Sequence, residues 1–171
     1  MIFRKKLTKG FTLLEVMAAI AVFSVGILGV YALVPMAILL GSENSDRFTA
    51  AQLALEGLEI ARNIRDSNWL EQNNNPSNLW NEGLDNCAAG CEADYTTLQN
   101  IDPTLTFYGV GRYLKIDSQG FFNYANGVST EKFKRKITIT NEVGALNISV
   151  EVEWSKKYPV LVLTEKLYDW R

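Results

Sequence analysis

The chain has 171 residues, of which 47% are hydrophobic, and its 17 basic and 19 acidic residues give a net charge of −2. It contains two cysteines and no histidine. The composition therefore excludes His-dependent catalytic triads and the usual His-containing metal sites. We expect no catalytic residues, no metal and no cofactor. The chain is long enough for one hydrophobic core and one further structural element.

That further element is an apolar run over residues 11–40, whose single charge is Glu15. The run exceeds the ~20 residues that a membrane-spanning helix needs, and it is too long for the core of a signal peptide. The flank before it, residues 1–10, holds four basic residues and no acidic one. Positive flanks stay in the cytoplasm, so we expect a single pass through the cytoplasmic membrane, with the rest of the chain outside.

A helical pattern continues beyond the apolar run. A polar stripe recurs at steps of four and three residues, and it consists of Gln52, Glu56, Glu59, Asn63 and Asp66. A less polar stripe lies on another face and consists of Ala50, Leu53, Gly57, Ile60 and Ile64. We expect one helix over residues 11–69, apolar all round over 11–40 and amphipathic over 41–69.

Weak helix formers concentrate in one part of this helix. Gly26, Gly29 and Pro35 lie within ten residues of each other. Because proline disrupts the interior of a helix, a local bend or a melted turn is expected there. The glycines, with Ala18, Ala19 and Ala21, either form a close-packing face for neighbouring helices or reflect ordinary membrane-helix composition.

The stretch over residues 71–103 is rich in Asn, Asp, Gly and Pro. This composition predicts a loop with at most short helical pieces, and loops of such length are commonly functional. Within it Cys87 and Cys91 enclose three residues. In an exported domain they predict a disulfide, whose short loop limits its stabilisation to ~2 kcal/mol.

After Pro103 the hydrophobic period changes to two, which indicates strands. Six are expected, over residues 105–109, 112–117, 121–124, 131–140, 146–154 and 160–167. The fold class is thus α+β, a long N-terminal helix with a C-terminal antiparallel sheet. We divide the chain into a leader (1–10), a transmembrane half-helix (11–40), an amphipathic half-helix (41–69) and a globular head (70–171), the head comprising a loop (70–103) and a sheet (104–171).

The clearest hairpin joins the two strands on either side of residues 141–144. We predict a register with Asn141 opposite Gly144, and it pairs Ile139 with Leu146, Ile137 with Ile148, Phe133 with Val152, Lys134 with Glu151, and Lys132 with Glu153. Arg135 then faces Val150 among apolar residues, and we expect its side chain to extend to the sheet edge.

The basic run over residues 132–136 includes an aromatic residue, Phe133, a combination that occurs at nucleic-acid interfaces. In the predicted register two of its lysines face glutamates on the neighbouring strand, which neutralise them. Without residues 1–10 the chain has 13 basic and 19 acidic residues, a net charge of −6. We therefore favour the cross-strand pairing and expect no nucleic-acid partner.

The segment KGFTLLEVMAAIAVFSVGILGV, residues 9–30, resembles the class III signal of type IV prepilins. Its features are a short basic leader ending in Gly10, then Phe11, three further residues and Glu15, followed by an apolar helix. The resemblance implies cleavage between Gly10 and Phe11 by a prepilin peptidase, N-methylation of Phe11, and assembly with other pilins or pseudopilins through the helix. The chain would first lie in the cytoplasmic (inner) membrane and then in a pilus or pseudopilus.

The family also pairs a long helix with an antiparallel sheet, as expected for this chain. Major pilins usually carry a proline about three residues earlier than Pro35, and the long Asn-rich loop is unlike a compact major subunit. The resemblance therefore implies a minor pilin or a pseudopilin.

Glu15 has two interpretations. Thr12 and Glu15 have the spacing of a capping box, and a carboxylate in the first turn interacts favourably with the helix dipole. Alternatively, a carboxylate this close to the bilayer needs a cationic partner, such as the amino group of Phe11 on a neighbouring subunit. We favour the second interpretation because the surrounding motif accompanies it.

A structural subunit without catalysis of its own is the leading hypothesis. The rival is a single-pass, membrane-anchored extracytoplasmic binding module, in which the helix is only a tether and residues 71–103 recognise a ligand. An anchored hydrolase has little support, because no nucleophile can be paired with a base. Cleavage after Gly10 distinguishes the structural subunit from the binding module, since a tether requires no cleavage.

Overall fold

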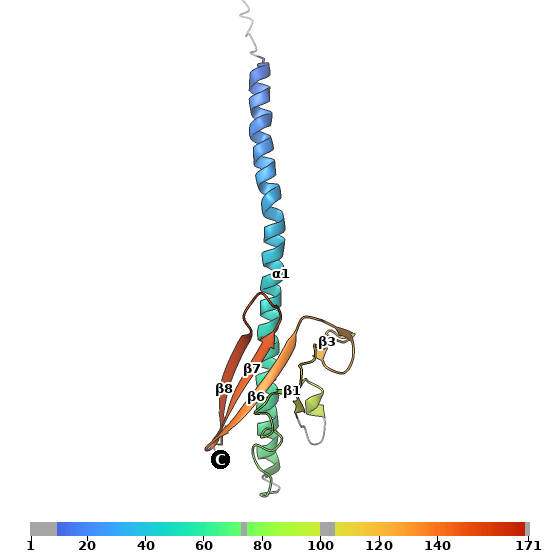
Figure 1. Ribbon diagram of the computed structural model, residues 1–171, viewed down its shortest axis with the longest axis vertical. Helices are drawn as coiled ribbons and strands as arrows, with labels where there is room; N and C mark the ends of the chain where they lie inside the picture. Colours follow the sequence, from blue (N-terminus) through green and yellow to red (C-terminus); the bar gives the residue numbers. More distant parts are fainter. Residues whose placement is uncertain (1–9, 73–74, 100–104, 170–171) are drawn as a thin grey trace, which may run out of the picture. The chain divides into compact units, whose positions relative to one another are not determined.

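The computed structural model describes residues 10–72, 75–99 and 105–169. It consists of two units, Met1–Asn44 and Ser45–Arg171. One helix, α1 (Leu13–Gln72), contributes to both, and antiparallel sheets follow it in the second unit (Figure 1). The expected α+β class, a long apolar N-terminal helix followed by antiparallel strands, is confirmed.

Helix α1 begins after Thr12, which caps it. The Thr12 side-chain Oγ1 accepts a hydrogen bond from the Glu15 backbone N–H at 3.3 Å, and this satisfies one free donor of the first turn. The helix continues through Pro35 to Gln72, three residues beyond the expected end. Proline leaves the carbonyl of Tyr31 without its helical donor, but the helix is not interrupted there. Of the two expected alternatives, a bend or a melted turn, the melted turn is therefore wrong.

Two sheets make up the rest of the second unit. The larger has the order β2-β1-β6-β7-β8, formed by β2 (Thr106–Phe107), β1 (Cys91–Glu92), β6 (Lys134–Glu142), β7 (Ala145–Glu153) and β8 (Leu161–Tyr168). The smaller has the order β4-β3-β5, formed by β4 (Phe122–Asn123), β3 (Lys115–Ile116) and β5 (Val128–Ser129). A short 3₁₀ helix, η1 (Thr97–Gln99), precedes β2.

The core of this unit lies between the larger sheet and the part of α1 beside it (Figure 1). The less polar stripe of the helix supplies it, since Ala50, Leu53, Ile60 and Ile64 are at most 3% exposed. Gly57 marks the closest approach, because a Cβ atom there would lie 2.9 Å from Cγ1 of Val150. The stripe identified from the sequence is thus the buried face.

The predicted hairpin is present, but its register differs by two residues. Ile139 lies opposite Ile148, Ile137 opposite Val150 and Lys134 opposite Glu153. Glu142 and Ala145 form the last pair, so the turn consists of two residues, and Gly144 adopts a φ of +67°. The predicted turn also had two residues, 142 and 143, so placing the turn one residue later moves each pairing by two positions without exchanging the two faces.

Strand β1 was not predicted, because it lies in the segment interpreted as a loop. Its two residues lie between β2 and β6, with Cys91 opposite both Phe107 and Ile137. A two-residue strand has no measurable period, and its partners are distant in sequence, so no local pattern indicates it. The short strand β5 was missed for the same reason.

The predicted disulfide joins Cys87 to Cys91, whose Cα atoms lie 5.3 Å apart. The two cysteines are 1% and 2% exposed, and the carbonyl of Cys87 accepts a hydrogen bond from Ile139 N at 3.1 Å. The disulfide therefore fixes the turn that leads into β1 against the larger sheet.

Replacing both Cys87 and Cys91 by Ser is expected to lower the free energy of unfolding by about 2 kcal/mol, the value for so short a closed loop. Urea unfolding of the purified chain in detergent measures the change. The unaltered protein in reducing agent should lose a similar amount, and an unchanged midpoint for both samples would contradict the prediction.

Candidate functional site

The N-terminal segment of the first unit is the first candidate. Gly10 and Phe11 precede the helix, and the Phe11 side chain is 82% exposed. Thr12 caps the helix, and Glu15 lies in its first turn. Phe11 and the peptide bond before it thus lie just outside the regular helix, and both residues that the bond joins are exposed.

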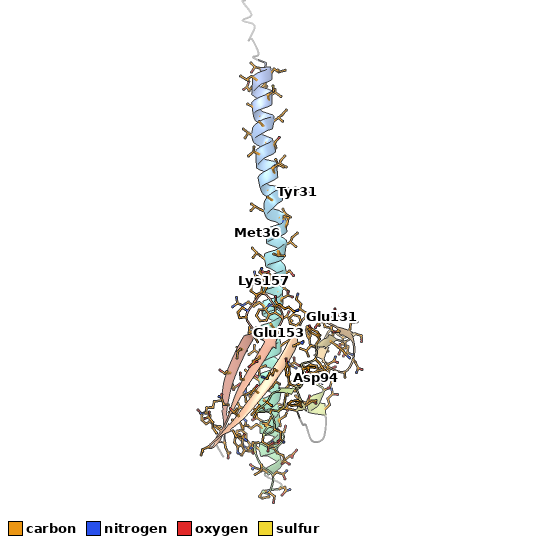
Figure 2. All side chains as sticks on the ribbon, viewed as in Figure 1. Tyr31, Met36, Asp94, Glu131, Glu153 and Lys157 are labelled. Atoms are coloured by element: carbon orange, nitrogen blue, oxygen red, sulfur yellow. A yellow bond between two sulfur atoms is a disulfide. The ribbon has the colours of Figure 1, made fainter. Side chains whose placement is uncertain are left out.

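The helix that follows presents apolar side chains on all sides. Every residue over 10–42 is exposed, and this stretch is long and apolar enough to cross a membrane. Figure 2 shows the side chains of the helix, Tyr31 and Met36 among them, pointing outward around its axis. Such a surface is not stable in water, so it requires a bilayer or the helices of other subunits.

A shallow hollow lies on one face of this helix at Gly26. Its walls are formed by Val22, Phe23, Ile27, Val30, Tyr31 and Val34. No atom lies within 4 Å of the position that a Cβ would occupy at Gly26 or Gly29. Small residues flanked by large apolar ones let another helix approach closely in a membrane, so the close-packing interpretation of the glycines keeps its support.

Glu15 is the single charged residue between Gly10 and Ser42. Half of the expected capping box is present, the bond from Glu15 N to Thr12 Oγ1. The reciprocal bond, from Thr12 N to the Glu15 carboxylate, is not formed among the described residues. The capping interpretation therefore explains the backbone of Glu15 and leaves its carboxylate available for a partner.

Arg135 of β6 is the second notable site, and the prediction that it reaches the sheet edge is wrong. Its side chain is fully buried, because Nη1 donates to the Leu53 carbonyl and to Glu56 Oε2, both at 2.9 Å. Its Nη2 donates to the carbonyl of Ala93. The guanidinium of Arg135 on β6 thus bonds both to α1 and to the segment after β1.

Other polar groups around Arg135 are also held inside. The Tyr124 hydroxyl donates to the Arg135 carbonyl at 3.1 Å, and burial raises the pKa of Tyr124 far above its ordinary value. Glu92, 2% exposed, accepts from Arg112 N at 2.7 Å and from Arg112 Nε at 2.6 Å. Asp94 accepts from Tyr124 N at 2.7 Å. These acceptors were missed because they lie in the segment interpreted as a loop.

The lysines of the basic run are engaged, although not in the predicted pairs. Lys132 forms an ion pair with Asp46 of α1. Lys134 lies opposite Glu153, and its Nζ is 4.7 Å from the centre of the Tyr113 ring. Lys136 lies opposite Glu151. The predicted register is wrong by two residues, but each of these lysines still has an acidic or aromatic neighbour.

In a comparison with known protein families, residues 5–31 match the prokaryotic N-terminal methylation motif. Comparisons with curated proteins and with solved structures found no match. The motif covers the predicted cleavage point, the capped helix start, Glu15 and the first part of the apolar helix. The chain therefore carries, at residues 5–31, the class III signal of type IV pilins and pseudopilins.

Proposed function

We propose that this type IV pilin-like precursor is a minor pilin or pseudopilin, a structural subunit cleaved after Gly10 and assembled through α1. The observation that carries the proposal is the methylation motif on an exposed apolar helix with one charge in its first turn. The motif implies processing by a prepilin peptidase and association with other pilins in the membrane. The long segment before β6, with its disulfide and short strands, favours a minor subunit over a compact major one.

The proposed assembly uses the two parts of the N-terminal segment differently. The apolar surface of α1 contacts lipid before assembly and neighbouring helices afterwards. This surface alone does not fix the position of one helix along its neighbours. The Glu15 carboxylate fixes that position, because it reaches a low-energy state only when a cation lies beside it. The new amino terminus at Phe11, which methylation leaves charged, is the matching group on a neighbouring subunit.

Processing tests this function. Co-expression with a prepilin peptidase is expected to remove residues 1–10 and leave N-methyl-Phe11 at the terminus, as measured by intact-protein mass spectrometry. Gly10→Val should remain uncleaved, since a branched side chain enters the position that glycine leaves open. As a control, Gly41→Val, which lies in α1 outside the motif, should be processed normally.

An intact N-terminus in the presence of active peptidase would contradict the proposal. It would favour the anchored binding module, whose tether needs no processing. If the chain is cleaved but is not recovered in sheared filaments or pseudopili, it is still a pilin-like precursor, but the proposed structural role is excluded.

A further inference from the structure

The turn between β4 and β5 contains the sequence Asn126-Gly127, and no other asparagine of the chain is followed by glycine. Asparagine is among the thermally labile residues of proteins. The backbone nitrogen of the next residue can attack its side-chain amide carbon, and a glycine presents that nitrogen with no side chain beside it. In a folded protein the reaction requires that the asparagine side chain and this nitrogen are both unengaged.

The Asn126 side chain does not hold the turn together. It is exposed, and no hydrogen bond to its amide is formed among the described residues. The turn is held instead by Asn123, whose Oδ1 accepts from Ala125 N at 3.0 Å and from Asn126 N at 2.7 Å. Asparagine also occurs in turns because it tolerates a positive φ, but Asn126 does not adopt one. Its side chain is therefore free to rotate toward the Gly127 nitrogen.

The nitrogen of Gly127 is directed away from the neighbouring strand. Thr130 N donates to the Leu114 carbonyl at 3.0 Å. Val128, two positions earlier, lies opposite Ile116. Because bonding alternates along an antiparallel pair, the even-numbered residues bond to β3 and the N–H of Gly127 points to the other side. There β5 is the edge of the smaller sheet, and no turn bond from Gly127 N is formed among the described residues.

The packing of the smaller sheet requires the glycine. Gly127 has a φ of +106°, and a Cβ atom there would lie 2.1 Å from the Ile116 carbonyl oxygen. Any other residue would therefore displace β3 or β5. The turn thus keeps at position 127 the residue whose nitrogen is least hindered, directly after an unengaged asparagine.

We propose that Asn126 is a site of spontaneous deamidation in the folded protein. The Gly127 nitrogen bonds to Cγ of Asn126, the Cγ–Nδ2 bond breaks, and the displaced amide nitrogen leaves as ammonia with the proton of the Gly127 amide. This intramolecular attack closes a succinimide ring. Water then opens the ring, at Cγ to leave aspartate or at the backbone carbonyl carbon to leave isoaspartate. The reaction consumes water, releases ammonia and involves no oxidation or reduction.

Each event adds a negative charge to the turn. Lys115 lies beside the new carboxylate, because its Nζ donates to the Ala125 carbonyl at 3.0 Å. Modified copies should accumulate with the age of the protein, since the reaction needs no enzyme. This chemistry is separate from assembly through α1, so either proposal can fail without the other.

The test follows the folded full chain, purified in detergent and incubated in mildly alkaline buffer. Proteolytic peptides are mapped by mass spectrometry, and isoaspartate is labelled with an isoaspartyl methyltransferase. The same chain unfolded in urea gives the rate that the Asn-Gly sequence has without the fold. Asn126→Gln is the matched control, because it keeps an exposed amide but lengthens the side chain, which disfavours ring closure.

We expect the peptide containing Asn126 to deamidate at least tenfold faster than any other asparagine peptide of the folded chain. Its rate should lie within tenfold of the rate in urea. The isoaspartyl label should appear at this position and be absent from the same peptide of Asn126→Gln.

The proposal is wrong if the folded chain does not deamidate at Asn126. It is also wrong if deamidation there is more than tenfold slower than in urea, because the turn then protects the side chain. Deamidation that yields aspartate alone is the third contrary result, since direct hydrolysis of the side chain leaves no isoaspartate.

Discussion

Arg135→Ala is expected to lower the free energy of unfolding of the head by about 3–5 kcal/mol, because it removes a buried side chain together with its hydrogen bonds. The guanidinium is completely buried, and it serves acceptors on Leu53, Glu56 and Ala93. Its loss leaves the carbonyl of Ala93 without a donor and opens a cavity between α1 and the larger sheet. Urea unfolding of the full chain in detergent measures the change.

Two further variants separate the causes. Arg135→Met fills most of the cavity, so it should lower the free energy of unfolding by less than Arg135→Ala does. The loss that remains measures the effect of the unpaired carbonyl groups. Glu56→Gln should cost about 1 kcal/mol, because the Glu56 side chain is 32% exposed and the amide oxygen still accepts a hydrogen bond. A loss below 1 kcal/mol for Arg135→Ala would show that the side chain lies in solvent, as the sequence pattern had predicted.

Glu15→Val is expected to reduce the amount of this subunit in filaments roughly tenfold or more, while membrane insertion and leader cleavage continue. Valine makes the helix more apolar, so membrane insertion is not reduced. Incorporation into filaments should fall, because the Phe11 amino group of a neighbouring subunit loses its counter-charge in a medium of low dielectric constant. The membrane-pellet and sheared-filament fractions of cells expressing each version give the measurement.

The capping interpretation predicts a smaller effect. Losing a first-turn carboxylate costs only ~0.3–1 kcal/mol, and the bond from Glu15 N to Thr12 Oγ1 survives any substitution of the Glu15 side chain. Glu15→Gln, which keeps the shape and removes the charge, should behave as Glu15→Val does, whereas Glu15→Asp should retain part of the assembly. If Glu15→Val enters filaments as well as the parent, the assembly role assigned to Glu15 is wrong.

Sequence reasoning was most successful where the signal is local. The apolar run, the cap at Thr12 and the spacing of Gly10, Phe11 and Glu15 lie within a few residues, and they predicted both the helix and the methylation motif. The period-two pattern located the long strands for the same reason. The pairing of Cys87 with Cys91 followed from their proximity and the expected compartment.

Prediction failed where two local preferences compete. The two-residue turn of the hairpin could be placed at residues 142–143 or one residue later, because both placements leave the same side chains on each face. Only the paired strands select Val143 and Gly144 as the turn. At Pro35 the local preference for a break is opposed by long stretches of helix on both sides, and the helix continues.

The sequence by itself determined the long apolar N-terminal helix and its methylation motif, since length, hydrophobic period and the order of residues 9–15 are readable without contacts. Only the tertiary structure decided the position of Arg135, because its acceptors lie 42 and 79 or more residues away along the chain. The same holds for β1 and for the open edge at β8, since an edge is defined by the strands that do not pair with it. A residue pattern encodes which face of a strand is apolar, but neighbours in a sheet are chosen by the packing of the whole core.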